Sequence, residues 1–139
     1  MKIKCINKSG SHLAEKAGYP SDYESLSLKV GTEYVVYAMA VWDEYLYYLL
    51  KPDHEDPDLN IDPVWYPFEW FEIMDHCLPA TWSFNHIAEP NVQDLSLIWG
   101  YKEIAFNLEH HKGIMEREAE DLAIFYARKK EIDEAFNCE

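Results

Sequence analysis

Residues 30–50 read VGTEYVVYAMAVWDEYLYYLL, and this stretch decides the fold that the sequence predicts. Residues 33–41 are rich in Tyr, Val and Met, and aromatic and β-branched side chains favour strands. Residues 42–44, WDE, form a short connection, and residues 45–50 continue with Tyr and Leu. Two strand-forming runs joined by a short turn are typical of an antiparallel hairpin. We therefore expect a long strand, a tight turn and an antiparallel partner strand.

Further strand signals flank this hairpin. Residues 2–6, KIKCI, alternate polar and apolar side chains as a half-buried strand does, and residues 7–22 contain two glycines and a proline, typical of a loop. Residues 51–63 form a second loop with three prolines among acids. Residues 64–67, VWYP, and then 68–73, FEWFEI, predict a short strand, a helical turn and a last strand.

This order of strands resembles a small SH3-like barrel in which residues 30–50 would be the central hairpin. The resemblance covers residues 1–75 and implies an SH3-like, strongly bent antiparallel sheet. Strands that follow one another through short connections should pair with their neighbours in the sequence.

The second half of the chain contains more helix-forming residues. Residues 95–99, LSLIW, indicate one more strand, and residues 101–111 gain helix formers. Gly113 interrupts this run, and a helix pattern then extends over residues 114–136. One face of that helix carries apolar residues at helical spacing: Met115, Ala119, Leu122 and Tyr126.

We therefore expect an α+β fold in a single domain, residues 1–139. Its β-rich SH3-like part spans residues 1–75, and a mainly helical part, residues 76–139, packs its terminal helix against the sheet.

Charge narrows the range of partners. The chain of 139 residues has 26 acids against 12 bases, a net charge of −14. A negative electrostatic field of this strength repels the phosphate backbone of nucleic acids, which argues against nucleic-acid binding. The same field favours a basic protein as partner. Half of the net charge lies in residues 51–75, which hold eight acids and one base, Lys51.

Cysteine usage and hydropathy indicate the cell compartment. Three widely spaced cysteines, Cys5, Cys77 and Cys138, are typical of a reduced compartment rather than a disulfide scaffold. The N-terminal residues show no apolar signal region, and the longest apolar stretch, residues 34–42, is far short of the roughly 20 residues that cross a bilayer. The sequence predicts a cytoplasmic protein without membrane contact and leaves its oligomeric state open.

The sequence contains no recognisable catalytic or metal-binding motif. The loop at 53–64 concentrates carboxylates, but Asp58 and Val64 stand where an EF-hand has its glycine and its bidentate glutamate. The His-Cys pair at 76–77 and the His-His pair at 110–111 are adjacent residues, whose side chains point in different directions, which disfavours a shared zinc ion. With 5 glycines and no phosphate-binding motif, we predict no cofactor, no metal, no catalytic residue and a non-enzymatic role.

Aromatic residues adjoin the acidic stretch and suggest a docking surface. Tyr and Trp dominate interface hot spots because they bury a large area and keep a polar group. We predict a partner-binding surface of five acids and three aromatic residues: Asp53, Glu55, Asp56, Asp58, Asp62, Trp65, Tyr66 and Trp70. The alternative is that most of these aromatic residues pack in the core.

In size and acidic charge, the chain resembles the immunity proteins of bacterial toxin–immunity systems. The run DHEDPDLNID at 53–62 and the adjoining VWYPFEWFE at 64–72 carry this resemblance. It implies an inhibitor that neutralises a basic toxin domain, with the acids in a cationic active-site cleft and the aromatic residues as anchors.

Two other functions stay open. One is a small-ligand-binding or enzymatic domain with an apolar pocket between the sheet and the terminal helix. The other is a phage-derived or regulatory accessory protein that dimerises through its C-terminal helix, which would leave a continuous apolar stripe exposed.

Overall fold

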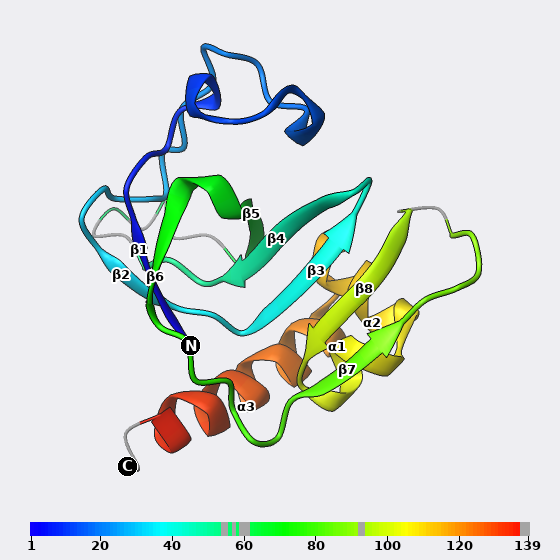
Figure 1. Ribbon diagram of the computed structural model, residues 1–139. Helices are drawn as coiled ribbons and strands as arrows, with labels where there is room; N and C mark the ends of the chain where they lie inside the picture. Colours follow the sequence, from blue (N-terminus) through cyan, green and yellow to red (C-terminus); the bar gives the residue numbers. More distant parts are fainter. Residues whose placement is uncertain (54–55, 57, 59–61, 92–93, 137–139) are drawn as a thin grey trace.

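The computed structural model describes residues 1–53, 56, 58, 62–91 and 94–136 (Figure 1). Its strands are β1 (Lys2–Cys5), β2 (Glu33–Val35), β3 (Ala38–Trp42), β4 (Tyr45–Leu50), β5 (Val64–Pro67), β6 (Phe71–Asp75), β7 (Ser83–His86) and β8 (Leu95–Gly100). Its helices are α1 (Lys102–Phe106), α2 (Leu108–Glu116) and α3 (Ala119–Phe136).

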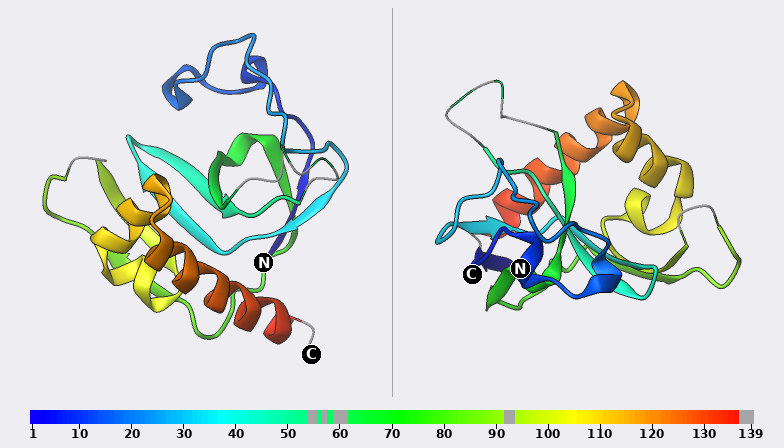
Figure 2. Two further views of the ribbon diagram at one scale, coloured as in Figure 1. Left: turned by 180° about the vertical axis from the view of Figure 1, so that it is seen from behind. Right: turned by 90° about the horizontal axis from the view of Figure 1, so that it is seen from above.

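The strands form two antiparallel sheets. One has three strands in the order β2-β1-β6, and the other has five in the order β5-β4-β3-β8-β7. The helices lie along one face of the five-stranded sheet, and the three-stranded sheet lies at its β4–β5 end (Figures 1 and 2). The predicted α+β class is confirmed.

The β3–β4 hairpin is the predicted one. Trp42 pairs with Tyr45, so Asp43 and Glu44 alone make the turn. Both have positive φ, 50° and 60°, which is the backbone of a two-residue type I′ turn that follows the twist of the strands.

The long strand predicted for residues 33–41 is divided between the two sheets. Its first part, β2, pairs with β1, and its second part, β3, pairs with β4 and β8. At the division, the Val36 amide donates to the Met1 carbonyl and the Tyr37 amide donates to the Leu49 carbonyl, 3.1 and 3.0 Å. These two hydrogen bonds go to different sheets, so the chain changes sheet here without a glycine or proline.

The segment after the acidic loop has the predicted order of strand, helical turn and strand. A 3₁₀ turn, Phe68–Trp70, carries the chain from β5 in the larger sheet to β6 in the smaller one. The Trp70 carbonyl accepts from the Ile6 and Asn7 amides, which fixes this turn against the end of β1.

The two predicted parts share one sheet. β8 and β7, which follow residue 75, extend the sheet of the β3–β4 hairpin, and the described residues form no closed barrel. The predicted strand at 95–99 is present within β8, β7 adds another strand, and the three helices follow.

The predicted long helix begins later than expected. Gly113 lies inside α2, and that helix ends at Arg117, whose φ of 57° is left-handed. A Cβ at Gly113 would collide with the Asp121 side chain, so glycine is the residue that lets α3 cross α2 this closely. The predicted apolar face is also wrong, because Met115 belongs to α2 and is exposed, and Tyr126 is 38% exposed.

Two buried clusters form the core. The first lies between the five-stranded sheet and the helices, and α3 contributes Phe125 and Ile132 to it. The second lies between the two sheets and contains Ile3, Leu50 and Trp70. β4 supplies both clusters because its alternate side chains point to opposite, covered faces.

Candidate functional site

The acids of the predicted surface all belong to the acidic loop, which we define as residues 51–63. Asp53, Asp56 and Asp58 are exposed, and the Asp53 side chain retains 83% of its surface. Asp62 is half-buried and accepts a hydrogen bond of 2.8 Å from the Tyr126 hydroxyl, which ties the end of the loop to α3. Glu55 lies outside the described residues.

The aromatic residues of the predicted surface lie in the core instead. Trp65, Tyr66 and Trp70 are 7%, 4% and 1% exposed. The Tyr66 hydroxyl meets the Ser27 hydroxyl at 2.7 Å, and Trp70 Nε1 donates to the Ser9 carbonyl at 2.9 Å. Trp65 and Tyr66 are adjacent in β5 and point to opposite faces, both of which are covered, and Trp70 is buried in the 3₁₀ turn that follows. None of the three is therefore an exposed anchor.

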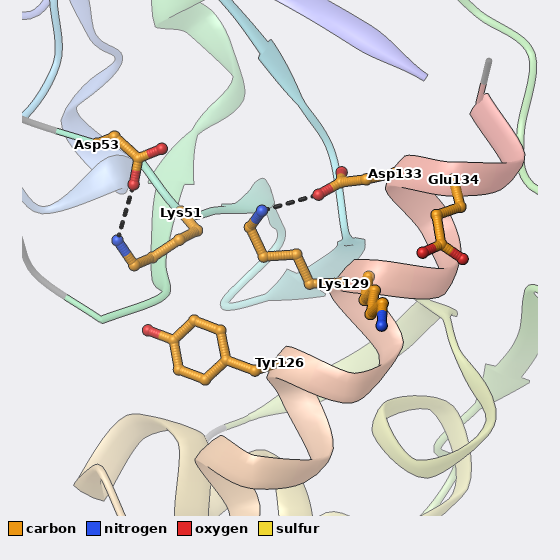
Figure 3. Close-up of a pocket in the computed structure, with 7 residues that line it drawn as sticks. Lys51, Asp53, Tyr126, Lys129, Asp133 and Glu134 are labelled. Atoms are coloured by element: carbon orange, nitrogen blue, oxygen red, sulfur yellow. Dashed lines mark hydrogen bonds and ion pairs between the residues drawn. The ribbon is translucent and has the colours of Figure 1, made fainter.

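A groove of about 550 Å³ runs between the start of the acidic loop and α3, and we call it the α3 groove (Figure 3). Seven residues line it: Lys51, Asp53, Tyr126, Lys129, Lys130, Asp133 and Glu134. Lys51 and Asp53 come from the loop side and the others from α3 (Figure 3). A hollow of about 280 Å³ shares Lys51, Asp53 and Lys129 with it.

Ion pairs hold two of the three lysines of this groove, Lys51 and Lys129, close to the protein surface. The Lys51 side chain is only 9% exposed, and its ammonium donates to the Pro52 carbonyl and to Asp53 at 3.3 Å. The Lys129 ammonium contacts Asp133 at 2.8 Å. Lys51 is the only base in the sequence of residues 51–75 and its side chain is largely buried, whereas the described acids Asp53, Asp56 and Asp58 are exposed.

Asp133 also accepts a hydrogen bond of 2.7 Å from the Tyr37 hydroxyl. Burial and this carboxylate raise the pKa of Tyr37. The Tyr126 phenol is similar: burial and its bond to Asp62 raise its pKa, so both hydroxyls keep their protons and remain donors. No sequence pattern predicted Tyr126 and Lys129 as groove residues, although Lys51 was notable as the lone base among acids.

The two adjacent histidines, His110 and His111, are both 0% exposed but differ in their hydrogen bonding. His110 Nδ1 donates to the Asp121 carboxylate at 2.9 Å, and its Nε2 lies 2.8 Å from the Tyr101 hydroxyl. Burial raises the pKa of Tyr101, so that phenol keeps its proton. These hydrogen bonds join Tyr101, the residue before α1, to α2 and α3. Asp121 keeps 21% of its side-chain surface, and with His110 it lines a hollow of about 370 Å³ at the α2–α3 junction.

His111 has no hydrogen-bond partner on either ring nitrogen among the described residues. Its ring lies 5.5 Å from that of Trp65 and 6.3 Å from that of Trp42, between centroids. Burial, with a smaller effect of the neighbouring His110, lowers the pKa of His111 to about 4. The imidazole is therefore neutral at physiological pH.

The described part of the chain brings no three His, Cys, Asp or Glu side chains together as a metal site. Cys5 is a buried free thiol and Cys77 an exposed one. Nor does any helix there have the length and apolarity that crossing a membrane requires. The surface features of the described residues include the acidic loop, the α3 groove, the acidic hollow at the α2–α3 junction and a hollow beside Trp42 and Trp65.

Comparison with protein-family models, curated proteins and solved structures finds no match for this chain.

Proposed function

We propose that the protein is a non-enzymatic binding protein that engages a basic protein partner through the outer face of the acidic loop. The resemblance to immunity proteins implies that this partner is a toxin domain and that binding neutralises the toxin. The proposed contact residues are Asp53, Asp56 and Asp58. A cytoplasmic location belongs to the same proposal.

The observation that carries the proposal is the opposite exposure of the acids and the base in this segment. Three acids face solvent, whereas Lys51, the only base of residues 51–75, keeps 9% of its side-chain surface. A cationic partner therefore meets carboxylates first. Complementary charge of this kind raises association rates and suppresses wrong partners.

Tyr126 takes the place of the buried aromatic residues as the apolar contact. It is 38% exposed, lines the α3 groove with Asp53 and donates its hydroxyl to Asp62. An amphipathic tyrosine beside carboxylates suits the aliphatic part of a partner's lysine or arginine as well as its charge.

The experiment compares three tagged proteins in affinity capture from the source cell lysate, followed by mass spectrometry. The first is the wild type, and the second is the loop variant Asp53→Asn, Asp56→Asn, Asp58→Asn. The third is a control that removes the same charge from a second acidic surface, at the α2–α3 junction: Glu109→Gln, Glu116→Gln, Glu120→Gln. Both triple variants change exposed residues, so both should fold.

We expect a basic protein to be captured by the wild type and the control and to be depleted with the loop variant. Exposed ion pairs contribute about 0.5–1 kcal/mol each, so the loss of three should weaken binding about ten- to a hundred-fold. Equal capture by all three proteins would reject the loop as the contact. Equal loss from both triple variants would mean that net charge alone attracts the partner.

A further inference from the structure

A hollow of about 250 Å³ lies between the start of β5 and the end of α2, and Pro63, the last residue of the acidic loop, is part of its lining. Its lining is mostly apolar: Trp42, Pro63, Val64, Trp65, Ile114, Met115 and Arg117. Trp42 is stacked on Tyr47, with ring centroids 3.7 Å apart and planes at 2°, and meets Trp65 edge-on at 5.4 Å. The aromatic walls of this indole hollow are thus fixed by ring contacts.

Buried polar atoms without partners gather behind these walls. Trp65 Nε1 and both ring nitrogens of His111 are buried and have no hydrogen-bond partner among the described residues. Trp65 and His111 rings are neighbours, 5.5 Å between centroids. A buried donor without a partner costs roughly 1–3 kcal/mol in comparable proteins, so an arrangement that leaves two such residues together calls for an explanation.

The rim of the hollow carries a cation in a strained conformation. Arg117 has φ 57° and ψ 41° at the C-terminus of α2, a position that glycine usually occupies. No hydrogen bond or ion pair joins its guanidinium to another described side chain. Left-handed non-glycine residues of this kind cluster at ligand sites, because function rather than local stability retains them.

We propose that the indole hollow is a binding site for a small aromatic carboxylate. The flat ring packs among Trp42, Ile114 and Met115, and the carboxylate meets the Arg117 guanidinium at the rim. This site is independent of the acidic docking surface proposed above, and each can fail without the other.

The donors around the hollow select the polar group of the ligand. The guanidinium N–H groups of Arg117 only donate, so the ligand must bring acceptor oxygens to the rim. A carboxylate accepts two parallel hydrogen bonds from a guanidinium, which is the strongest such pairing. Glu116 and Glu118 flank Arg117 along the chain and offset its positive charge. A small anion without an aromatic ring should therefore bind weakly here, because binding needs both the hydrogen bonds to the guanidinium and the apolar packing of the ring.

The size of the hollow selects a small ring system. An apolar cavity of about 150 Å³ accepts one benzene ring in another protein, so about 250 Å³ suits one or two fused rings. We therefore choose 2-naphthoate as the probe. The second probe, 2-naphthylmethylammonium, has the same ring and the opposite charge. It tests whether Arg117 at the rim or the net negative charge of the protein determines which probe binds more tightly.

Isothermal titration calorimetry on the full chain measures both probes against wild type, Arg117→Gly and Lys112→Gln. Glycine suits the left-handed position, so the first variant removes the guanidinium without disturbing the fold. Lys112→Gln removes the same charge from α2 at an exposed residue that does not line the indole hollow. Thermal melting of each variant checks that it is folded.

We expect saturable naphthoate binding to wild type and Lys112→Gln, about tenfold or greater weakening in Arg117→Gly, and a shift of the Trp65 indole resonance in ¹⁵N spectra. Absence of saturable naphthoate binding to the wild type overturns the proposal. So does equal affinity of Arg117→Gly and wild type, or tighter binding of the ammonium probe.

Discussion

Replacing His111 by phenylalanine should remove a large part of the protein's sensitivity to acid. His111 is wholly buried, and its pKa falls from the ordinary 6.5 to about 4 in the folded chain, chiefly because burial disfavours the charged ring. In the unfolded chain the imidazole regains its ordinary pKa. Between those two values the unfolded state binds a proton that the folded state does not, so stability is complete above about pH 6.5 and falls as the pH decreases.

The size of the effect follows from the gap between the two pKa values. The loss is about 2 kcal/mol near pH 5 and roughly 3 kcal/mol once the pH is below 4. Phenylalanine places a ring of similar shape beside Trp42 and Trp65 and does not titrate.

The assay is urea unfolding, followed by circular dichroism, near pH 7 and near pH 5. Between these conditions the wild type should lose about 2 kcal/mol more than His111→Phe. His86→Gln, a change at an exposed histidine, is the matched control and should behave as the wild type does. If His111→Phe and the wild type lost equal stability, the imidazole would not be buried and neutral as described.

Three further changes test the packing of the fold by the same unfolding assay. Gly113→Ala should destabilise the protein by about 1–3 kcal/mol, because its Cβ would displace the Asp121 side chain; unchanged stability would contradict the close approach of α2 and α3. Asp43→Asn with Glu44→Gly should stabilise the hairpin by about 1 kcal/mol, since both positions have positive φ, and a loss would rule out the type I′ turn. Glu103→Gln should lower the free energy of unfolding by about 1 kcal/mol, because it breaks the two-pronged ion pair of Glu103 in α1 with Arg128 in α3. An unchanged free energy of unfolding would show that this ion pair does not stabilise the fold.

The sequence predicted the elements that depend on local pattern. The hairpin of β3 and β4 follows from two strand-forming runs around Asp43 and Glu44, and the order of β5, the 3₁₀ turn and β6 follows from residues 64–73. Both were confirmed because neighbouring residues alone decide them.

Features that depend on distant contacts were missed. The chain changes sheet at Val36 and Tyr37 because their amides bond to Met1 and Leu49, and no local turn signal marks the place. Gly113 was interpreted as a helix interruption, whereas the approach of α3 requires it inside α2.

The candidate site was predictable in its charges and not in its aromatic residues. Acids in a proline-rich loop are solvated wherever the loop goes, so the exposure of Asp53, Asp56 and Asp58 followed from composition. The exposure of Trp65 and Tyr66 depends on which faces of β5 are covered. Only the arrangement of the second sheet and the helices decides that, and it covers both faces.

If the acidic loop docks on a basic protein, the association rate constant depends on the charge of the loop. Stopped-flow kinetics measures that rate constant, with the captured partner purified and the salt concentration varied. We predict a rate constant that falls steeply with salt, and at low salt is lower for the Asp53→Asn, Asp56→Asn, Asp58→Asn variant than for the charge-matched control, with smaller changes in dissociation. A rate constant that is insensitive to salt, or equal for the two variants, would contradict docking through this loop.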